Sequence, residues 1–270
     1  MVDTNHKIAF CIDSDGCAMD TMTYKHQLFF GPIAADIFGI SEQERTSFLK
    51  EWDRVNLYSR TRGVNRFVGL VMGLEFAGVE HIDKLKEWVE TTDSLSNNSL
   101  ELALANDFSR DLEKALEWSN EVNRQIKNYE GDSLAFSGVL ESLERLSQFG
   151  NVYVVSSANK EAVWQEWEEQ GLLKYVDDIY CQDRGKKEDV IATLIASGYC
   201  RETILMVGDS LGDLAAAEQN GIAFYPVLVG KEVKSWEILR EDIGEAFAKG
   251  QFEQQRQKES INTFWANLDN

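Results

Sequence analysis

The chain has few of the residues that separate domains or build zinc and disulfide sites. Only two prolines occur in 270 residues, and no Gly/Ser-rich linker divides the chain. Any second domain is therefore expected to be inserted or closely docked. The cysteines form no CxxC pair and have no zinc-type spacing with the three histidines; they are Cys11, Cys17, Cys181 and Cys200. We expect reduced, mostly buried thiols, as in a cytoplasmic protein.

Long apolar runs and a basic charge balance are also absent. No segment approaches the roughly 18 consecutive apolar residues that a membrane span needs, and residues 1–10 show no basic-then-apolar signal pattern. With 46 acidic against 27 basic residues, the formal net charge is −19. This charge disfavours nucleic acid and anionic membrane surfaces as partners, because both would repel the chain. We expect a cytoplasmic protein that binds neither, and the sequence leaves its oligomeric state open.

The hydrophobic pattern changes once along the chain. Hydrophobic residues make up 43% of the sequence, which suits a packed core. Residues 24–130 show helical periodicity almost throughout. From residue 131, apolar runs such as 152–155 and 203–207 alternate with helical segments, and residues 7–12 have the same apolar character. Continuous apolar strands between helices are typical of a parallel sheet that is covered on both faces.

The predicted architecture is therefore of the α/β class. A doubly wound, Rossmann-like parallel-sheet core is predicted for residues 1–20 and 131–270. Residues 21–130 are predicted to form an inserted all-helical domain. Its apolar stripes are interpreted as the core of a helical bundle, not as a cofactor site.

Polar residues follow four of the apolar runs at their carboxyl ends. Ligands bind beyond these ends in an open parallel sheet, so we expect the side chains to meet at one edge. A set of acids, a hydroxyl and a lysine pair at one edge indicates a catalytic site. The clusters are Asp13-Ser14-Asp15-Gly16, Ser156, Lys186-Lys187, and 208–213 with Asp209 and Asp213.

Most clusters also have a simpler interpretation. The first could open a calcium loop, but Ala18 and Tyr24 stand where that loop needs a glycine and a glutamate. Ser156 could cap the helix that follows it, and the lysine pair could be solvated at a helix start. The calcium loop is excluded, and the other two alternatives stay open.

The order of the four clusters, each after a strand, resembles the motifs of the haloacid dehalogenase (HAD) superfamily. The resemblance covers residues 1–20 and 131–230. Asp20-Thr21 with Tyr24, followed by a helical insert, is similar to the branch of β-phosphoglucomutases and phosphatases that carries a helical cap domain. This resemblance implies a HAD fold in which residues 21–130 are the cap.

The resemblance also implies a phosphoric monoester hydrolase that acts through an aspartyl-phosphate. Asp13 would be the nucleophile, ionised at neutral pH with an unperturbed pKa of about 3.9. Asp15 would protonate the leaving alcohol and then activate water. Ser156 and Lys187 would hold the phosphoryl oxygens, with Lys186 as the alternative lysine. Branches of the family that do not cleave phosphate esters generally lack an aspartate at the position of Asp15.

The implied cofactor is Mg2+, and the implied substrate is a small phosphorylated metabolite. The ion would be bound by the Asp13 carboxylate, the Asp15 backbone carbonyl and Asp209, with Asp213 as a ligand or a neighbour of the ligands. A hard cation of this kind prefers oxygen donors. It would also let several carboxylates share one pocket.

The insert is expected to supply specificity. Arg62 and Arg66 are predicted to share one helical face and to bind an anionic or hydroxylated part of the substrate. Ion pairs with the abundant glutamates are the alternative role for both arginines. Lys25 falls where the mutases of this family carry a histidine. A sugar phosphomutase and a catalytically silent binding protein on this fold stay open as alternatives to a phosphatase.

Overall fold

The α/β part of the chain is built on one five-stranded parallel sheet. The computed structural model describes residues 7–269; residues 1–6 and 270, which the predicted core boundaries include, lie outside this range. The strand order is β3-β2-β1-β4-β5, and every neighbouring pair is parallel. The strands are β1 (Ala9–Ile12), β2 (Asn151–Val155), β3 (Asp178–Tyr180), β4 (Ile204–Gly208) and β5 (Ala223–Pro226). The predicted parallel sheet is confirmed, with the first strand at its centre.

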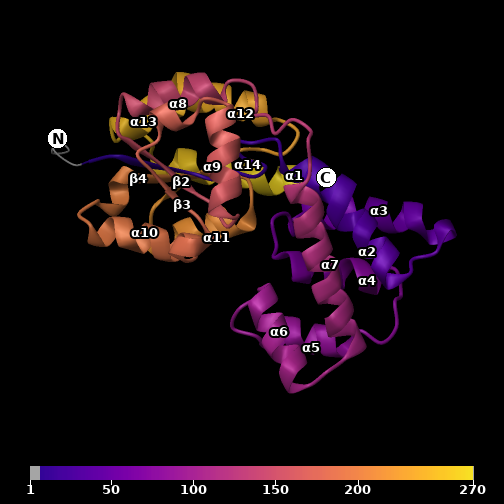
Figure 1. The fold of residues 1–270 in the computed structure, drawn as a ribbon. Coiled ribbons are helices and arrows are strands. Elements are labelled where there is room, and N and C mark those ends of the chain that lie inside the picture. The colour runs from indigo at the N-terminus through magenta and orange to yellow at the C-terminus, as the bar shows by residue number, and fades with distance from the viewer. Residues whose placement is uncertain (1–6, 270) are drawn as a thin grey trace. The chain divides into compact units, whose positions relative to one another are not determined.

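Helices cover both faces of this sheet, as the alternation of side chains along β1 requires. Phe10 and Ile12 pack with helices α8, α9, α12 and α13, whereas Ala9 and Cys11 pack with α10, α11 and α14. Figure 1 shows α8 and α13 on one side of the strands and α10 and α11 on the other. The helices are α8 (Val139–Ser147), α9 (Lys160–Glu169), α10 (Lys187–Ala196), α11 (Leu211–Asn220), α12 (Glu232–Ile238), α13 (Gly244–Ala248) and α14 (Gln254–Leu268).

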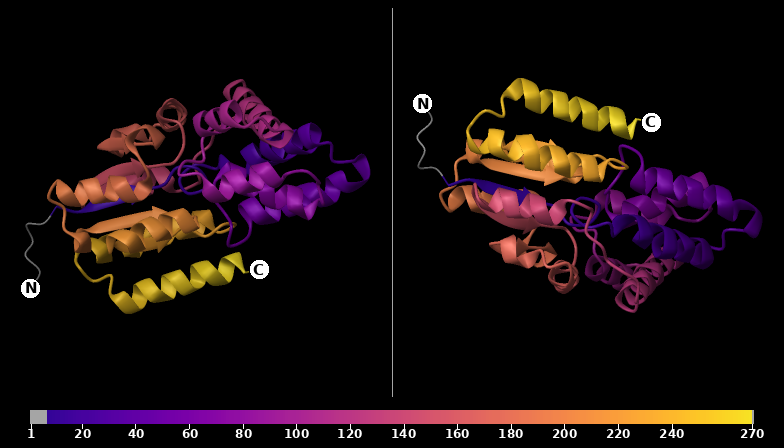
Figure 2. Two further views of the ribbon diagram at one scale, coloured as in Figure 1. Left: turned by 90° about the horizontal axis from the view of Figure 1, so that it is seen from below. Right: turned by 90° about the horizontal axis from the view of Figure 1, so that it is seen from above.

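The C-terminal segment contributes helices to both faces of the sheet. A π-helical turn, Leu239–Ile243, joins α12 to α13. Helix α14 then packs through Phe264 and Leu268 into the core beneath β5, and Figure 2 shows it in yellow along the outside of the sheet. Across residues 7–269, none of the helices combines the length and the apolar character that a bilayer-spanning segment requires.

The remaining residues form a helical unit with a core of its own. Trp52 and Trp118 lie at its centre with their rings 6.1 Å apart, and the Trp118 indole donates to the Phe30 carbonyl at 3.0 Å. The apolar stripes predicted from the sequence therefore form a bundle core. The helices are α1 (Met22–Tyr24), the π-helix Lys25–Phe30, α2 (Gly31–Phe38), α3 (Glu42–Leu57), α4 (Arg66–Phe76), α5 (Asp83–Thr91), α6 (Asn97–Asn106) and α7 (Arg110–Lys127).

Contacts within the chain divide it into these two units. One comprises the described parts of Met1–Met22 and Ser133–Asn270, and the other is Thr23–Asp132. A helical unit is thus inserted after the first strand of a doubly wound parallel sheet. The predicted fold class is confirmed by this arrangement.

The prediction that Arg62 and Arg66 share one helical face is wrong. Arg62 lies in a turn that precedes α4, and Arg66 is the first residue of that helix. The Arg62 amide donates to the Ser59 carbonyl at 2.9 Å, and Gly63 follows with φ of +74°. The left-handed glycine lies between the two arginines and interrupts any helix there. Residues four apart across this break do not share a helical face.

Candidate active site

The loop after β1 is held in a fixed shape by its own backbone. The Asp13 amide donates to the Val207 carbonyl at 3.0 Å, so Asp13 extends the pairing of β1 with β4. The chain then turns at Gly16, which has φ of +81°. Three successive amides, those of residues 17–19, donate to the Ser14 carbonyl at 3.2, 3.0 and 2.9 Å. The loop therefore presents Asp13 and Asp15 from a rigid frame.

A second loop, between β4 and α11, brings two more carboxylates to the same place. Carboxylate oxygens of Asp13, Asp209 and Asp213 lie within 4.8 Å of one another, and all three residues are buried. Asp213 caps α11 reciprocally with Ser210: its Oδ2 accepts from the Ser210 amide at 3.0 Å and hydroxyl at 2.7 Å. A Cβ atom on Gly208 would lie 2.2 Å from Asp213 Cγ, so only glycine leaves room there.

Lys187 is the cation of this cluster. It is the first residue of α10 and is only 8% exposed. Its ammonium lies 2.7 Å from Asp13 Oδ1 and 2.6 Å from Asp213 Oδ1. Lys186 is the exposed residue that precedes the helix. Of the two lysines between which the sequence left a choice, Lys187 is the one that contacts the carboxylates.

Burial and the neighbouring charges change the pKa values of Asp13 and Lys187. Burial, together with the charges of Asp213 and Asp209, raises the pKa of Asp13 well above its usual range, although Lys187 opposes the shift. The expectation of an unperturbed Asp13 is therefore wrong, because the sequence did not show how completely this side chain is buried. Burial alone would lower the pKa of Lys187, but Asp13 and Asp213 outweigh it and raise that pKa above its usual value.

The two remaining predicted site residues follow β1 and β2. Asp15 is half-buried, and its Oδ1 accepts a hydrogen bond from the buried hydroxyl of Thr21. Ser156 Oγ accepts from the Ala158 amide at 3.1 Å. Ser156 is not the cap of the next helix, because Asn159 caps α9. Helix capping therefore does not explain why a serine stands at position 156.

The donor set of the cluster fits a hard divalent cation. Asp13, Asp209 and Asp213 offer only carboxylate oxygens, which such cations prefer. The Asp15 carboxylate does not belong to this group of described residues. A bound cation would offset the repulsion among three buried carboxylates, which one ammonium offsets only in part.

The predicted specificity residues lie in the helical unit. Arg62 is 2% exposed and donates to the Leu57 carbonyl at 2.8 Å. Arg66 is partly buried and donates to Asn123 Oδ1 at 2.7 Å. Lys25 begins the π-helix and is partly buried. Both arginines therefore have positions set by contacts within the helical unit itself.

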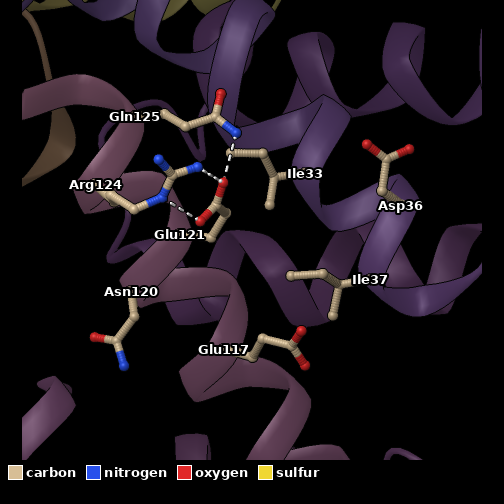
Figure 3. A pocket seen from close by; sticks show the side chains of 8 residues that line it. All are labelled: Ile33, Asp36, Ile37, Glu117, Asn120, Glu121, Arg124 and Gln125. Carbon is tan, nitrogen blue, oxygen red and sulfur yellow. Dashed lines mark hydrogen bonds and ion pairs between the residues drawn. The ribbon is translucent and has the colours of Figure 1, made fainter. Parts of the chain in front are cut away.

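A surface groove of about 540 Å³ lies between α2 and α7 of the helical unit (Figure 3). Arg124 pairs with Glu121 at 2.7 and 2.5 Å, and Gln125 donates to Glu121 at 2.8 Å. Two further acids, Asp36 and Glu117, leave the lining acidic. None of the predicted site residues lines it. The lining residues are Ile33, Asp36, Ile37, Glu117, Asn120, Glu121, Arg124 and Gln125.

Three contacts at the site were not predicted. The Lys187 ammonium donates to Asp213, which lies 26 residues further along the chain, and the Thr21 hydroxyl donates to Asp15. The buried indole of Trp167 donates to Ser14 Oγ at 2.9 Å. Thr21 was noticed only as part of the family resemblance. The partners of Lys187 and of Trp167 are too far away in the chain to leave a periodic signal in a single sequence.

Buried carboxylates and a lysine thus lie at the carboxyl edge of a parallel α/β sheet, where doubly wound proteins bind their ligands. A family model described as haloacid dehalogenase-like hydrolase matches residues 78–227, more than half of the chain. The chain belongs to this family. No curated protein matches it significantly in sequence.

Solved structures of this family have the same fold. A haloacid dehalogenase-like family hydrolase from Xanthomonas campestris has a TM-score of 0.54 and 14% identity, with 93% of this chain and 96% of that chain covered. A protein assigned as a phosphoglycolate phosphatase from Lactobacillus delbrueckii subsp. bulgaricus has a TM-score of 0.53, 17% identity and coverages of 90% and 98%. For a protein assigned as a β-phosphoglucomutase from Thermotoga maritima, the values are 0.50, 18%, 88% and 99%. At identities this low, the structural similarity shows a shared fold and nothing more specific. That fold is the HAD core with a helical cap.

The burial of Lys187 predicts a large and pH-dependent effect on stability. Replacing Lys187 with Met leaves buried carboxylates without their cation and should lower the free energy of unfolding at pH 7 by about 3 kcal/mol. An acid whose pKa is raised on folding destabilises the folded state above the pKa of the unfolded chain. The loss should therefore shrink as the pH falls toward and below about 4, where Asp13 becomes protonated in the unfolded as well as in the folded state.

Urea unfolding of Lys187→Met without divalent ions, at several pH values, measures this loss. Lys186→Met is the matched control, because Lys186 is exposed, and it should change stability by less than about 0.5 kcal/mol. Equal effects of the two substitutions would contradict the role given to the buried ion pairs.

Proposed function

We propose that this protein is a Mg2+-dependent phosphatase that hydrolyses a small phosphorylated metabolite through an aspartyl-phosphate. The observation that carries the proposal is the contact of the Lys187 ammonium with Asp13 at 2.7 Å, inside a cluster of three buried carboxylates. Such a cluster can receive an anionic group only if cations compensate its charge. A phosphate ester that is bound with a metal ion meets this requirement.

The proposed reaction has two steps. The Asp13 carboxylate attacks phosphorus, the bond to the leaving alcohol breaks, and Asp15 gives that alcohol its proton. Water then attacks the aspartyl-phosphate, Asp15 takes the proton of the water, and Asp13 and inorganic phosphate are released. The half-buried position of Asp15 and its bond from Thr21 suit a group that must exchange a proton while its orientation stays fixed.

The other residues bind and orient the phosphoryl group. Lys187 favours the ionised form of Asp13, which the nucleophile requires, and would bind a phosphoryl oxygen. Ser156 would donate its hydroxyl hydrogen to another phosphoryl oxygen, since its bond from Ala158 uses only a lone pair. Asp13, Asp209 and Asp213, with the carbonyl of Asp15, would hold Mg2+, which supplies charge neutralisation when bound.

The expected setting and partners follow from composition. A net charge of −19 disfavours nucleic acid and supports a small-molecule substrate that is bound through local cations. All four cysteines are free thiols, which suits the cytoplasmic location that we propose. A phosphomutase would conserve phosphate and need a bisphosphate activator, and a silent binding protein would release none. Release of inorganic phosphate therefore separates the three functions.

Turnover of p-nitrophenyl phosphate tests the proposal. We expect release of nitrophenol and inorganic phosphate that depends on Mg2+ and is lost on chelation. Asp13→Asn should lower kcat by at least about 1,000-fold, because the nucleophile is removed while the side-chain shape is kept. Lys186→Met should retain the wild-type rate. An Asp13→Asn variant with the wild-type rate, or turnover that is indifferent to Mg2+, would contradict the proposal.

We further propose that Lys25, Arg62 and Arg66 in the helical unit contribute to substrate recognition, in its role as a cap domain. Once a panel of phosphorylated metabolites has given the best substrate, Arg66→Gln should lower kcat/KM for it about 10-fold or more by removing a charged donor. The loss for p-nitrophenyl phosphate should be small. Arg62→Gln needs a parallel unfolding measurement because Arg62 is buried. If both substitutions leave kcat/KM unchanged for that substrate, the arginines have no such role.

A further inference from the structure

Ser14 separates the two acids of the site, and all of its polar groups are engaged. Its amide donates to Asp13 Oδ1 at 2.8 Å, and its carbonyl accepts from the amides of residues 17–19. Its hydroxyl oxygen accepts from the Trp167 indole at 2.9 Å. The residue is fully buried. The orientation of the Asp13 carboxylate thus depends directly on where Ser14 is held.

Trp167 reaches this loop from a distant part of the chain. It lies on α9, 153 residues after Ser14, and is fully buried in the core that includes Ile12 and Val163. An indole offers one hydrogen-bond donor and no acceptor. Because neither partner is exposed, water cannot replace this bond without opening the core.

A second indole holds the far end of the same loop. Trp236, on α12, donates to the Cys17 carbonyl at 2.9 Å. Its acceptor is a backbone atom, whereas the acceptor of Trp167 is the side chain between Asp13 and Asp15. A role in packing alone would require the volume of Trp167 but neither its N–H nor a hydroxyl at residue 14.

We propose that Trp167 is a positioning residue of the active site. It acts through Ser14, whose amide orients the Asp13 carboxylate and whose carbonyl sets the turn that carries Asp15. The part of this inference that concerns catalysis rests on the proposed phosphatase function. The part that concerns the loop does not, because it states only how firmly the backbone of residues 13–19 is held.

The catalytic part is tested by removing the two ends of the bond separately and together. Trp167→Phe and Ser14→Ala should each lower kcat for p-nitrophenyl phosphate about 5- to 10-fold, as expected for one buried hydrogen bond, with KM within about twofold of wild type. The double variant should lose no more than the larger single loss, because both changes remove one interaction. Trp118→Phe is the control, since it removes a buried indole bond within the helical unit, and it should keep kcat.

The loop part is tested by amide hydrogen exchange on the peptide that contains residues 13–19. Exchange should be at least about fivefold faster in Trp167→Phe and in Ser14→Ala, and unchanged in Trp118→Phe. Unchanged exchange in a folded Trp167→Phe, unchanged kcat, or losses of kcat that multiply in the double variant would each overturn the proposal. If the wild type is inactive but exchange is faster in both variants, the proposed phosphatase function is overturned, whereas the role of Trp167 in holding the loop is supported.

Discussion

The site depends on one electrostatic constraint: three carboxylates are buried together, and a single buried ammonium contacts two of them. Lys187 lies 2.7 Å from Asp13 and 2.6 Å from Asp213. In a medium from which water is excluded, removing this ammonium would leave the buried carboxylates without compensation. Burial, and after it the charges of Asp213 and Asp209, raise the pKa of Asp13, so ionised Asp13 is unfavourable in this arrangement. A cation or a cation–anion pair that enters the site can offset this cost.

The parallel sheet is what brings these charges together. β1 lies between β2 and β4, with Ile12 opposite Val154 on one side and Val207 on the other. The loops after the three strands therefore emerge side by side and present Asp13, Ser156 and Asp209. Helix α10 adds Lys187 from its first turn. The two tryptophans on α9 and α12 then hold the loop after β1 from the opposite face of the sheet. Fold and site thus depend on the same core.

Much of this could be predicted from the sequence, because buried parallel strands and the residues at their carboxyl ends are local patterns. The alternation after residue 131 predicted the sheet, and three of the four clusters supplied Asp13, Lys187, Asp209 and Asp213, which lie together in the structure. The failures concern properties that burial or long-range contact decides. The acidity of Asp13 depends on neighbours 196 and 200 positions away, and the break between Arg62 and Arg66 depends on one left-handed glycine. Neither has a periodic signature.

The central claim is that Asp13 carries the phosphoryl group during turnover, and trapping of that intermediate tests it most directly. The protein is mixed with Mg2+ and an excess of a reactive phosphoryl donor such as acetyl phosphate, quenched rapidly in acid and digested for mass spectrometry. The account predicts the mass of one phosphoryl group on the peptide that contains Asp13, absent in Asp13→Asn and absent when Mg2+ is chelated. Phosphorylation at another residue, or turnover of the donor with an unmodified Asp13 at every quench time, would contradict it.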